Sequence, residues 1–247
     1  MAKRGQIAGY DGGKGIKIFC VCLAAFVFVS ALALIFLGNF ISSSQTQFFD
    51  YVVVIDAGHG GIDGGVVGKT SGVKESELNL KMAYLLKEEF ETCGIKVVLT
   101  RTDENGLYGE ATDGFKKRDM AKRKEIILDA KADMVISVHM NKFSSSLRSG
   151  PQVFFDQNSE AGQKLATRIQ TSLNAFTGNS HAALKGDYYM LKCTTSPSVI
   201  VECGFLSNPY EEQQLLDETY RKKLARKIFE GALLFMSYSG IDSGDVV

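Results

Sequence analysis

The sequence predicts an α/β fold: a mostly parallel twisted sheet of about six strands with helices on both faces, preceded by one N-terminal transmembrane helix. Three observations support this prediction. Short β-branched runs alternate along the chain with longer segments of helical periodicity, which indicates strands joined through helices. An apolar content of 45% with 23% charged residues is typical of a globular chain. A long apolar stretch near the N-terminus stands apart from the alternation.

That stretch, residues 18–37, is long enough to cross a bilayer, because about 20 helical residues rise about 30 Å. Basic residues precede it and none follows closely, so the N-terminus should stay cytoplasmic and the remainder be exported. Small residues at Ala31 and Ala33 leave a cleaved signal peptide as the alternative. We therefore expect a protein anchored on the outer side of the cytoplasmic membrane, or secreted if the segment is cleaved. The expected parts are 1–17 as a cytoplasmic basic tail, 18–37 as the anchor or signal segment, 38–49 as a linker, 50–240 as the globular domain and 241–247 as a C-terminal tail.

Within the globular domain, strand-like and helix-like segments follow one another. Leu78, Met82, Leu86 and Phe90 recur at the spacing of one helix face, and Gly94 follows the end of this stripe. Strands that alternate with helices in this way favour a parallel sheet covered on both faces. The expected strands are Tyr51–Ile55, Ile95–Leu99, Met134–Val138, Gln152–Phe155, Tyr188–Leu191 and Val199–Val201; the expected helices are Leu78–Phe90, Phe115–Lys131, Glu160–Phe176 and Leu224–Met236.

Charge and cysteine content narrow the function classes. The chain has 28 basic and 28 acidic residues, and a net charge of zero gives no electrostatic footprint for nucleic acid. Cys93, Cys193 and Cys203 are scattered and odd in number, which allows at most one disulfide or indicates a poorly oxidising environment. Cys203 adjoins Glu202 and could be a nucleophile, although a small packed residue at a strand end is the favoured interpretation.

Four polar side chains lie near the ends of predicted strands or of glycine-rich turns. His59 follows the run VVVID, His139 ends VISVH and Glu202 ends SVIVE, while Glu75 follows a glycine-rich stretch and precedes a helix. Strand ends are where an α/β sheet presents its chemistry. Two neutral imidazoles and a carboxylate make a three-ligand zinc site with an open fourth position, and a further glutamate could transfer protons.

Each of these residues also has a structural interpretation. The glycines around His59 could cradle a phosphate, although no Lys-Ser or Lys-Thr pair follows them. Glu75 could be a carboxylate favoured by a helix N-terminus, and His139 a histidine with an ordinary hydrogen-bond partner. Glu202 could pair with a basic helix; as a desolvated carboxylate it would instead have a raised pKa suited to a general base. His181 lies in a polar loop and is expected at the surface or on the substrate side.

Five segments carry a resemblance to a known family. IDAGHGGIDGG, GVKESELNL, VVLTRTDEN, ADMVISVHMN and VIVECGFLSNPYEEQQLL together resemble the zinc-dependent N-acetylmuramoyl-L-alanine amidases of the bacterial cell wall. The resemblance implies that His59, Glu75 and His139 bind Zn²⁺ and that Glu202 is the catalytic carboxylate. It implies peptidoglycan as the substrate, cleaved at the amide between the muramic acid lactyl group and L-alanine, with 50–240 as the catalytic domain.

The short layout behind one N-terminal hydrophobic segment is similar to the spore-cortex amidases of this family, which take part in making the muramic δ-lactam needed for germination. This similarity implies a location in the forespore or cortex space. It also implies the membrane as a partner, through the N-terminal helix, and allows an accessory activator protein, because the family includes partner-regulated members. The competing functions are a zinc peptidase of related fold and a wall-binding protein without catalytic activity. All four expected polar residues are present, which argues against an inactive protein.

Two residues depart from the family pattern. Ala57 stands where the family commonly has proline, and Leu128 stands where asparagine is usual, so we expect a local hydrogen bond to be missing at Leu128. Some relatives carry an inserted helix after the second histidine strand that blocks the zinc. Only the short loop Asn141–Gly150 follows that strand here, which leaves little room for such an insertion.

Overall fold

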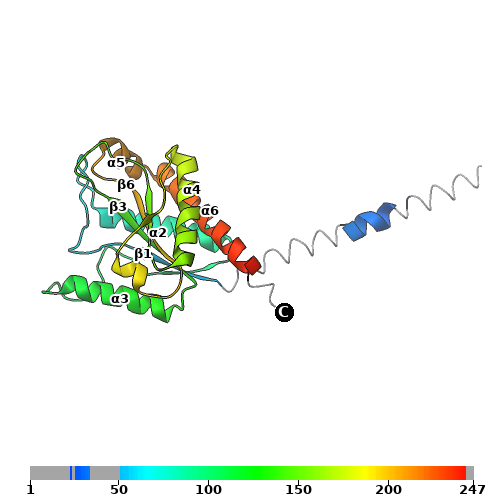
Figure 1. Cartoon of the computed structure of the whole chain (residues 1–247), viewed down its shortest axis with the longest axis horizontal. Coiled ribbons are helices and arrows are strands. Elements are labelled where there is room, and N and C mark those ends of the chain that lie inside the picture. Colours follow the sequence, from blue (N-terminus) through cyan, green and yellow to red (C-terminus); the bar gives the residue numbers. More distant parts are fainter. Residues whose placement is uncertain (1–22, 24–25, 34–50, 243–247) are drawn as a thin grey trace, which may run out of the picture. The chain divides into compact units, whose positions relative to one another are not determined.

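The computed structural model describes residues 23, 26–33 and 51–242 (Figure 1). The chain divides into two units, Met1–Gln47 and Phe48–Val247. In the first unit, residues 26–33 are helical, and the Ser30 hydroxyl donates to the carbonyls of Phe26 and Val27, each at 2.9 Å. No helix among the described residues is both long and apolar enough to span a membrane. Most of the predicted segment 18–37, with the tail before it and the linker after it, lies outside these residues.

The second unit contains a six-stranded sheet in the order β2-β1-β3-β6-β4-β5. The first four strands in this order are parallel, β4 runs antiparallel to β6, and β5 is parallel to β4. This confirms the predicted α/β class with a mostly parallel sheet. The strands are β1 Val52–Ala57, β2 Lys96–Leu99, β3 Met134–Asn141, β4 Gln152–Phe155, β5 Leu184–Lys185 and β6 Ser198–Phe205.

Helices cover both faces of this sheet, as predicted. On one face, Val53 and Ile55 pack in a large apolar cluster with residues of α2, α4 and α6. On the other face, Val54 packs in a smaller cluster with residues of α3 and η2, and Figure 1 shows α3 on the side opposite α4 and α6. Alternate residues of one strand thus enter two cores. The helices are α2 Glu75–Thr92, α3 Phe115–Asp129, α4 Glu160–Thr177, α5 Pro209–Leu216, α6 Glu218–Asp242 and the 3₁₀ helix η2 Tyr189–Lys192.

The predicted strand Tyr188–Leu191 is wrong. Tyr188 is instead the N-cap of the 3₁₀ helix η2, and the other three residues lie within that helix. Their burial does not alternate: Tyr188 and Tyr189 are exposed, while the adjacent Met190 and Leu191 are both buried in the smaller core. A single turn presents two neighbouring side chains to one surface, whereas a strand would turn them to opposite faces. The sixth strand is instead the two-residue β5, and α5 was not expected.

Two strands extend further than predicted, and this places functional candidates inside the sheet. His139 lies within β3 and Glu202 lies within β6, and the two are register partners on neighbouring parallel strands. The register shifts between His139 and Asn141, which indicates a β-bulge directly beyond this pair. Because β1 is the other neighbour of β3, the loop after β1 opens at the same edge of the sheet.

Candidate metal centre

His59 has a backbone conformation unusual for a residue with a side chain. Its φ is 61°, in the left-handed region, and Gly60 and Gly61 beside it have φ values of 144° and 60°. A residue other than glycine in this region costs on the order of 1–3 kcal/mol and persists only where the surroundings enforce it. The glycine-rich sequence after β1 therefore permits a turn that directs His59 toward the neighbouring strands.

Two buried arginines hold this turn by its carbonyl groups. Arg101 donates to the carbonyls of Ala57 at 2.9 Å and Gly58 at 3.1 Å. Arg123 donates to the carbonyls of Ala57 at 2.7 Å and His59 at 2.5 Å. Successive carbonyls are thus fixed by guanidinium groups from two other elements, so the backbone of His59 is defined on the side away from its imidazole.

Arg123 is itself neutralised inside the protein. Its side chain is 2% exposed and pairs with Asp56 and with Asp119, each at 2.6 Å. Asp56 also accepts hydrogen bonds from the hydroxyls of Thr100 at 2.7 Å and Ser137 at 2.5 Å. Burial alone would raise the pKa of Asp56, but Arg123 and these two hydroxyls outweigh it and lower the pKa to about 2. Arg123 and Asp56 therefore form a buried ion pair whose other polar atoms also have hydrogen-bond partners.

Glu75 is the first residue of α2, and its carboxylate points into the protein. One oxygen, Oε2, accepts from the backbone amide of Val66 at 2.8 Å. The other, Oε1, accepts from the amide of Met140 at 3.1 Å and from the side-chain amide of Asn79 at 3.3 Å. A Cβ on Gly65 would lie 2.4 Å from Oε2, so only glycine allows the backbone to pass so close. Glu75 is thus both the first residue of α2 and a member of the candidate metal site.

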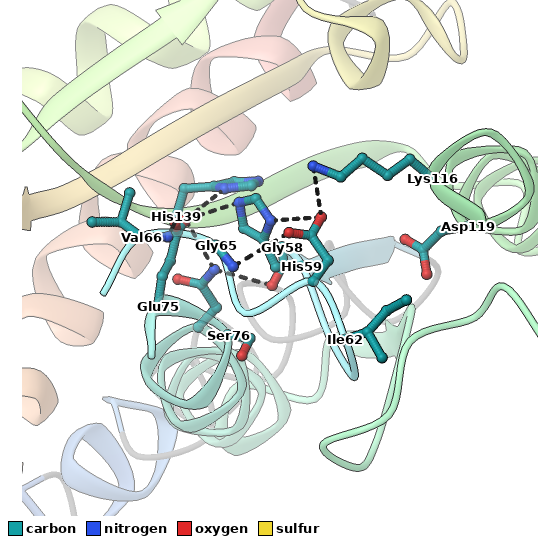
Figure 2. Close-up of polar contacts among 12 residues, drawn as sticks. Gly58, His59, Ile62, Gly65, Val66, Glu75, Ser76, Lys116, Asp119 and His139 are labelled. Atoms are coloured by element: carbon teal, nitrogen blue, oxygen red, sulfur yellow. Dashed lines mark hydrogen bonds and ion pairs between the residues drawn. The ribbon is translucent and has the colours of Figure 1, made fainter. Parts of the chain in front are cut away.

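The three predicted metal ligands lie together, with His59 and His139 both directed toward Glu75 (Figure 2). Nδ1 of His139 lies 2.9 Å from Glu75 Oε1, and Nε2 of His59 lies 3.3 Å from the same oxygen. One ligand atom from each of the three residues lies within 4.8 Å of the others, and the two imidazoles meet edge to face with centroids 5.0 Å apart. A Cβ on Gly58 would lie 2.2 Å from the His139 ring, so this glycine is also required by the packing. The chemistry and spacing of this donor set suit a metal ion.

The electrostatics of the group favour a positive charge at its centre. Burial would lower the pKa of His59, but the hydrogen bonds and charges of Glu75 and Asp63 outweigh it and raise the pKa to about 9. Burial would raise the pKa of Glu75, but His139 and His59 hold it well below its ordinary value. Asp63 Oδ2 lies 3.0 Å from Nδ1 of His59, so Nε2 is the nitrogen left to face Glu75.

Glu202 lies beside this group without joining it. It lines a cavity of about 280 Å³ together with His59 and His139, and its Oε2 is buried with no hydrogen-bond partner in the part of the chain that the structure describes. Burial raises its pKa to about 7; His139 opposes this shift, and the charge of Glu75 adds to it. A carboxylate of this kind can take up and release a proton near neutral pH.

The other residues singled out in the sequence lie apart from the four. His181 is half-buried, with Nδ1 3.4 Å from the carbonyl of Pro151. Cys93, Cys193 and Cys203 are free thiols. Cys203 is fully buried, and burial raises its thiol pKa far above the ordinary value, so the packing interpretation holds and the nucleophile interpretation does not. Leu128 is exposed on α3.

Sequence reasoning missed the residues that orient the ligands: Asp56, Asp63, Arg101 and Arg123. A signal existed for three of them, because Asp56 and Asp63 flank the His59 turn and Arg101 lies two residues after the end of β2. No such signal exists for Arg123, which is one of six basic residues in the 15-residue helix α3.

A parallel α/β sheet that carries a His-Glu-His group and a desolvated carboxylate at one edge has the architecture of a metal-dependent hydrolase. A model of the N-acetylmuramoyl-L-alanine amidase family matches residues 53–233. The chain belongs to this family. The predicted enzyme class, an N-acetylmuramoyl-L-alanine amidase, is therefore confirmed.

Individual relatives agree with this placement. The germination-specific N-acetylmuramoyl-L-alanine amidase of Bacillus subtilis is 31% identical over 194 residues, which cover 76% of this chain and 81% of the relative. The CwlD amidase from Clostridioides difficile, solved in complex with the GerS lipoprotein, is 36% identical with a TM-score of 0.73, over 76% of this chain and all of that one. The catalytic domain of CwlV from Paenibacillus polymyxa is 30% identical with a TM-score of 0.67, over 76% of this chain and 98% of that one.

Proposed function

We propose that this amidase is zinc-dependent and that it cleaves spore-cortex peptidoglycan between the muramic acid lactyl group and L-alanine, as a step toward the muramic δ-lactam needed for germination. The observation that carries the proposal is the convergence of His59, Glu75 and His139 within 4.8 Å, beside a cavity that His59, His139 and Glu202 line together.

Zinc fits these residues. Two imidazoles and one carboxylate are a three-ligand set that zinc uses in catalytic sites, where a fourth position stays open for water. Asp63 on Nδ1 of His59, and the amides on Glu75, hold the ligands in the manner of second-layer contacts around metal sites. When bound, zinc would lower the pKa of its water and polarise the scissile carbonyl.

Glu202 is the residue that would move the proton. It takes a proton from the attacking water and returns it to the alanine nitrogen, which would otherwise leave as a poorly stabilised amide anion. Its position on β6 opposite His139 directs it into the cavity that His59 and His139 line, and its Oε2, which has no hydrogen-bond partner among the described residues, is available to exchange a proton there. Burial raises its pKa to about 7, which suits both steps.

The cortex assignment rests on the relatives. The B. subtilis protein is named as germination-specific, and the CwlD structure contains a lipoprotein partner. We extend both properties to this chain: action in the forespore or cortex space, and an accessory protein that binds it. The N-terminal segment 18–37 would hold the enzyme on the outer side of the membrane.

Spores that lack the protein should lack muramic δ-lactam in muropeptide profiles, and a normal cortex would contradict the cortex role.

The catalytic assignment is tested by Glu202→Gln, with digestion of peptidoglycan and zinc content measured on the same preparation. We expect zinc content to be retained and hydrolysis to fall by about two orders of magnitude or more, since general acid–base catalysis contributes about 10²–10⁴-fold. Glu160→Gln, an exposed carboxylate on α4, is the matched control and should change neither quantity. His59→Ala should lose bound zinc. Retained hydrolysis in Glu202→Gln, or an unchanged zinc stoichiometry in His59→Ala, would refute the respective role.

A further inference from the structure

Lys116 is a cation on the wall of the catalytic cavity. It is the second residue of α3 and lines the cavity shared by His59, His139 and Glu202. Its side chain is 68% exposed, so its ammonium group can be reached from solvent, and Figure 2 shows it extending from α3 toward His59. The first turn of α3 contains no acidic residue to neutralise it.

The ion pair that Lys116 makes within the protein is weak. Its Nζ lies 3.7 Å from Asp63 Oδ2, which is too long for a hydrogen bond, while the same Asp63 oxygen lies 3.0 Å from Nδ1 of His59. Asp63 is therefore committed mainly to the imidazole. An ammonium has three donors, so Lys116 can bind a second anion without giving up a strong contact.

The remainder of the cavity wall offers an anion no equivalent partner. Arg123 also lines the cavity, but it is buried and committed to two carboxylates and two carbonyls. Tyr188, Met190 and Ile200, which also line the cavity, have mainly apolar side chains. Among the lining residues that the structure describes, Lys116 is the exposed cation, so an anionic group of the substrate has one favourable place.

We infer that Lys116 is a specificity-determining residue, which binds a carboxylate of the peptide stem and thereby places the stem along the α3 side of the cavity. This inference rests on the proposed function, because that function defines the peptide as the leaving group. The stem residue after L-alanine carries a carboxylate that is either free or amidated in peptidoglycan, and it lies one residue from the scissile bond. Lys116 would distinguish these two forms by charge.

The experiment compares two muropeptides that differ only in this carboxylate, one free and one amidated. For the full chain we expect kcat/KM to be about three- to tenfold higher on the free form, which is the range of an exposed to partly desolvated ion pair. Lys116→Gln should reduce this preference to near unity while zinc content is retained. Lys117→Gln removes the same charge one residue further along the exposed surface of α3, and it should keep the wild-type preference.

Salt provides a second readout, because the wild-type preference should shrink as ionic strength rises. A Lys116→Gln enzyme that keeps the full preference would overturn the inference. So would equal losses on both substrates together with lost zinc, which would assign Lys116 to the metal centre instead. Cleavage of neither muropeptide by the wild type would overturn the proposed function, and this inference with it.

Discussion

Replacing Arg123 by methionine should destabilise the domain strongly, although methionine preserves most of the volume. The change leaves the Asp56 carboxylate buried without its cation, and it removes donors from the carbonyls of Ala57 and His59. Removing one partner of a buried charge pair costs about 3–5 kcal/mol. Total stabilities are about 5–15 kcal/mol, so a large share of the free energy of unfolding would be lost.

Urea unfolding at neutral pH measures this loss. Arg226→Met is the matched control, because Arg226 pairs with Glu89 and Glu230 on the surface and its side chain is 52% exposed. The control should cost less than about 1 kcal/mol. If Arg123→Met does not fold, Arg123→Lys retains the charge but loses the planar set of donors, and it should fall between wild type and methionine.

A double variant separates charge from packing. Adding Asp56→Asn to Arg123→Met removes the stranded carboxylate, so the double variant should be more stable than Arg123→Met alone. A cost below about 1 kcal/mol for Arg123→Met would refute the reasoning, because the arginine would then be dispensable to the turn that carries His59.

Three further predictions concern the metal, acidity and packing. Asp63→Asn should weaken zinc binding about tenfold or more, because His59 loses the carboxylate on Nδ1; competition with a chelator measures this, and unchanged affinity would assign Asp63 no role. Asp56 has its pKa lowered from 3.8 to about 2, so its contribution of about 2 kcal/mol is present above pH 3.8 and is lost as the pH falls through 2; unfolding midpoints of wild type and Asp56→Asn at pH 4 and 2 should diverge in their pH dependence, and parallel curves would contradict this. Gly231→Ala should destabilise by at least about 1 kcal/mol despite the better helix propensity of alanine, because its Cβ would lie 2.5 Å from the Ile169 Cα of α4; a raised Tm would show that α4 and α6 separate at little cost.

The convergence of the metal ligands could be predicted from the sequence because it follows from topology. His59 and His139 follow or end apolar strands, and the carboxyl ends of neighbouring parallel strands share one edge of the sheet. Glu75 was harder to assign, since a carboxylate at a helix start has a structural use of its own. The structure places Glu75 both at the start of α2 and in the group of three side chains that could hold a metal ion.

Other features could not be predicted, for different physical reasons. The buried position of Arg123 depends on which face of a basic helix meets the sheet, and the six basic residues of α3 obscure that face. The run Tyr188–Leu191 was too short for its periodicity to distinguish a strand from a turn. For α5 the signal was present but overlooked: Asn208 caps the helix through its side chain and Pro209 is the first helical residue.

The carbonyl contacts that Arg101 and Arg123 make behind His59 have a consequence for how metal and fold are coupled. The ligands are positioned by arginines, amides and glycine packing, and none of these contacts involves the ion itself. We therefore expect zinc to bind to a largely preformed site. Zinc fingers differ, because they fold only when their ion binds. We expect the chelated protein to keep its secondary structure and to regain activity on readdition of zinc. Exchange for cobalt would then give a coloured, spectroscopically visible form of the same centre.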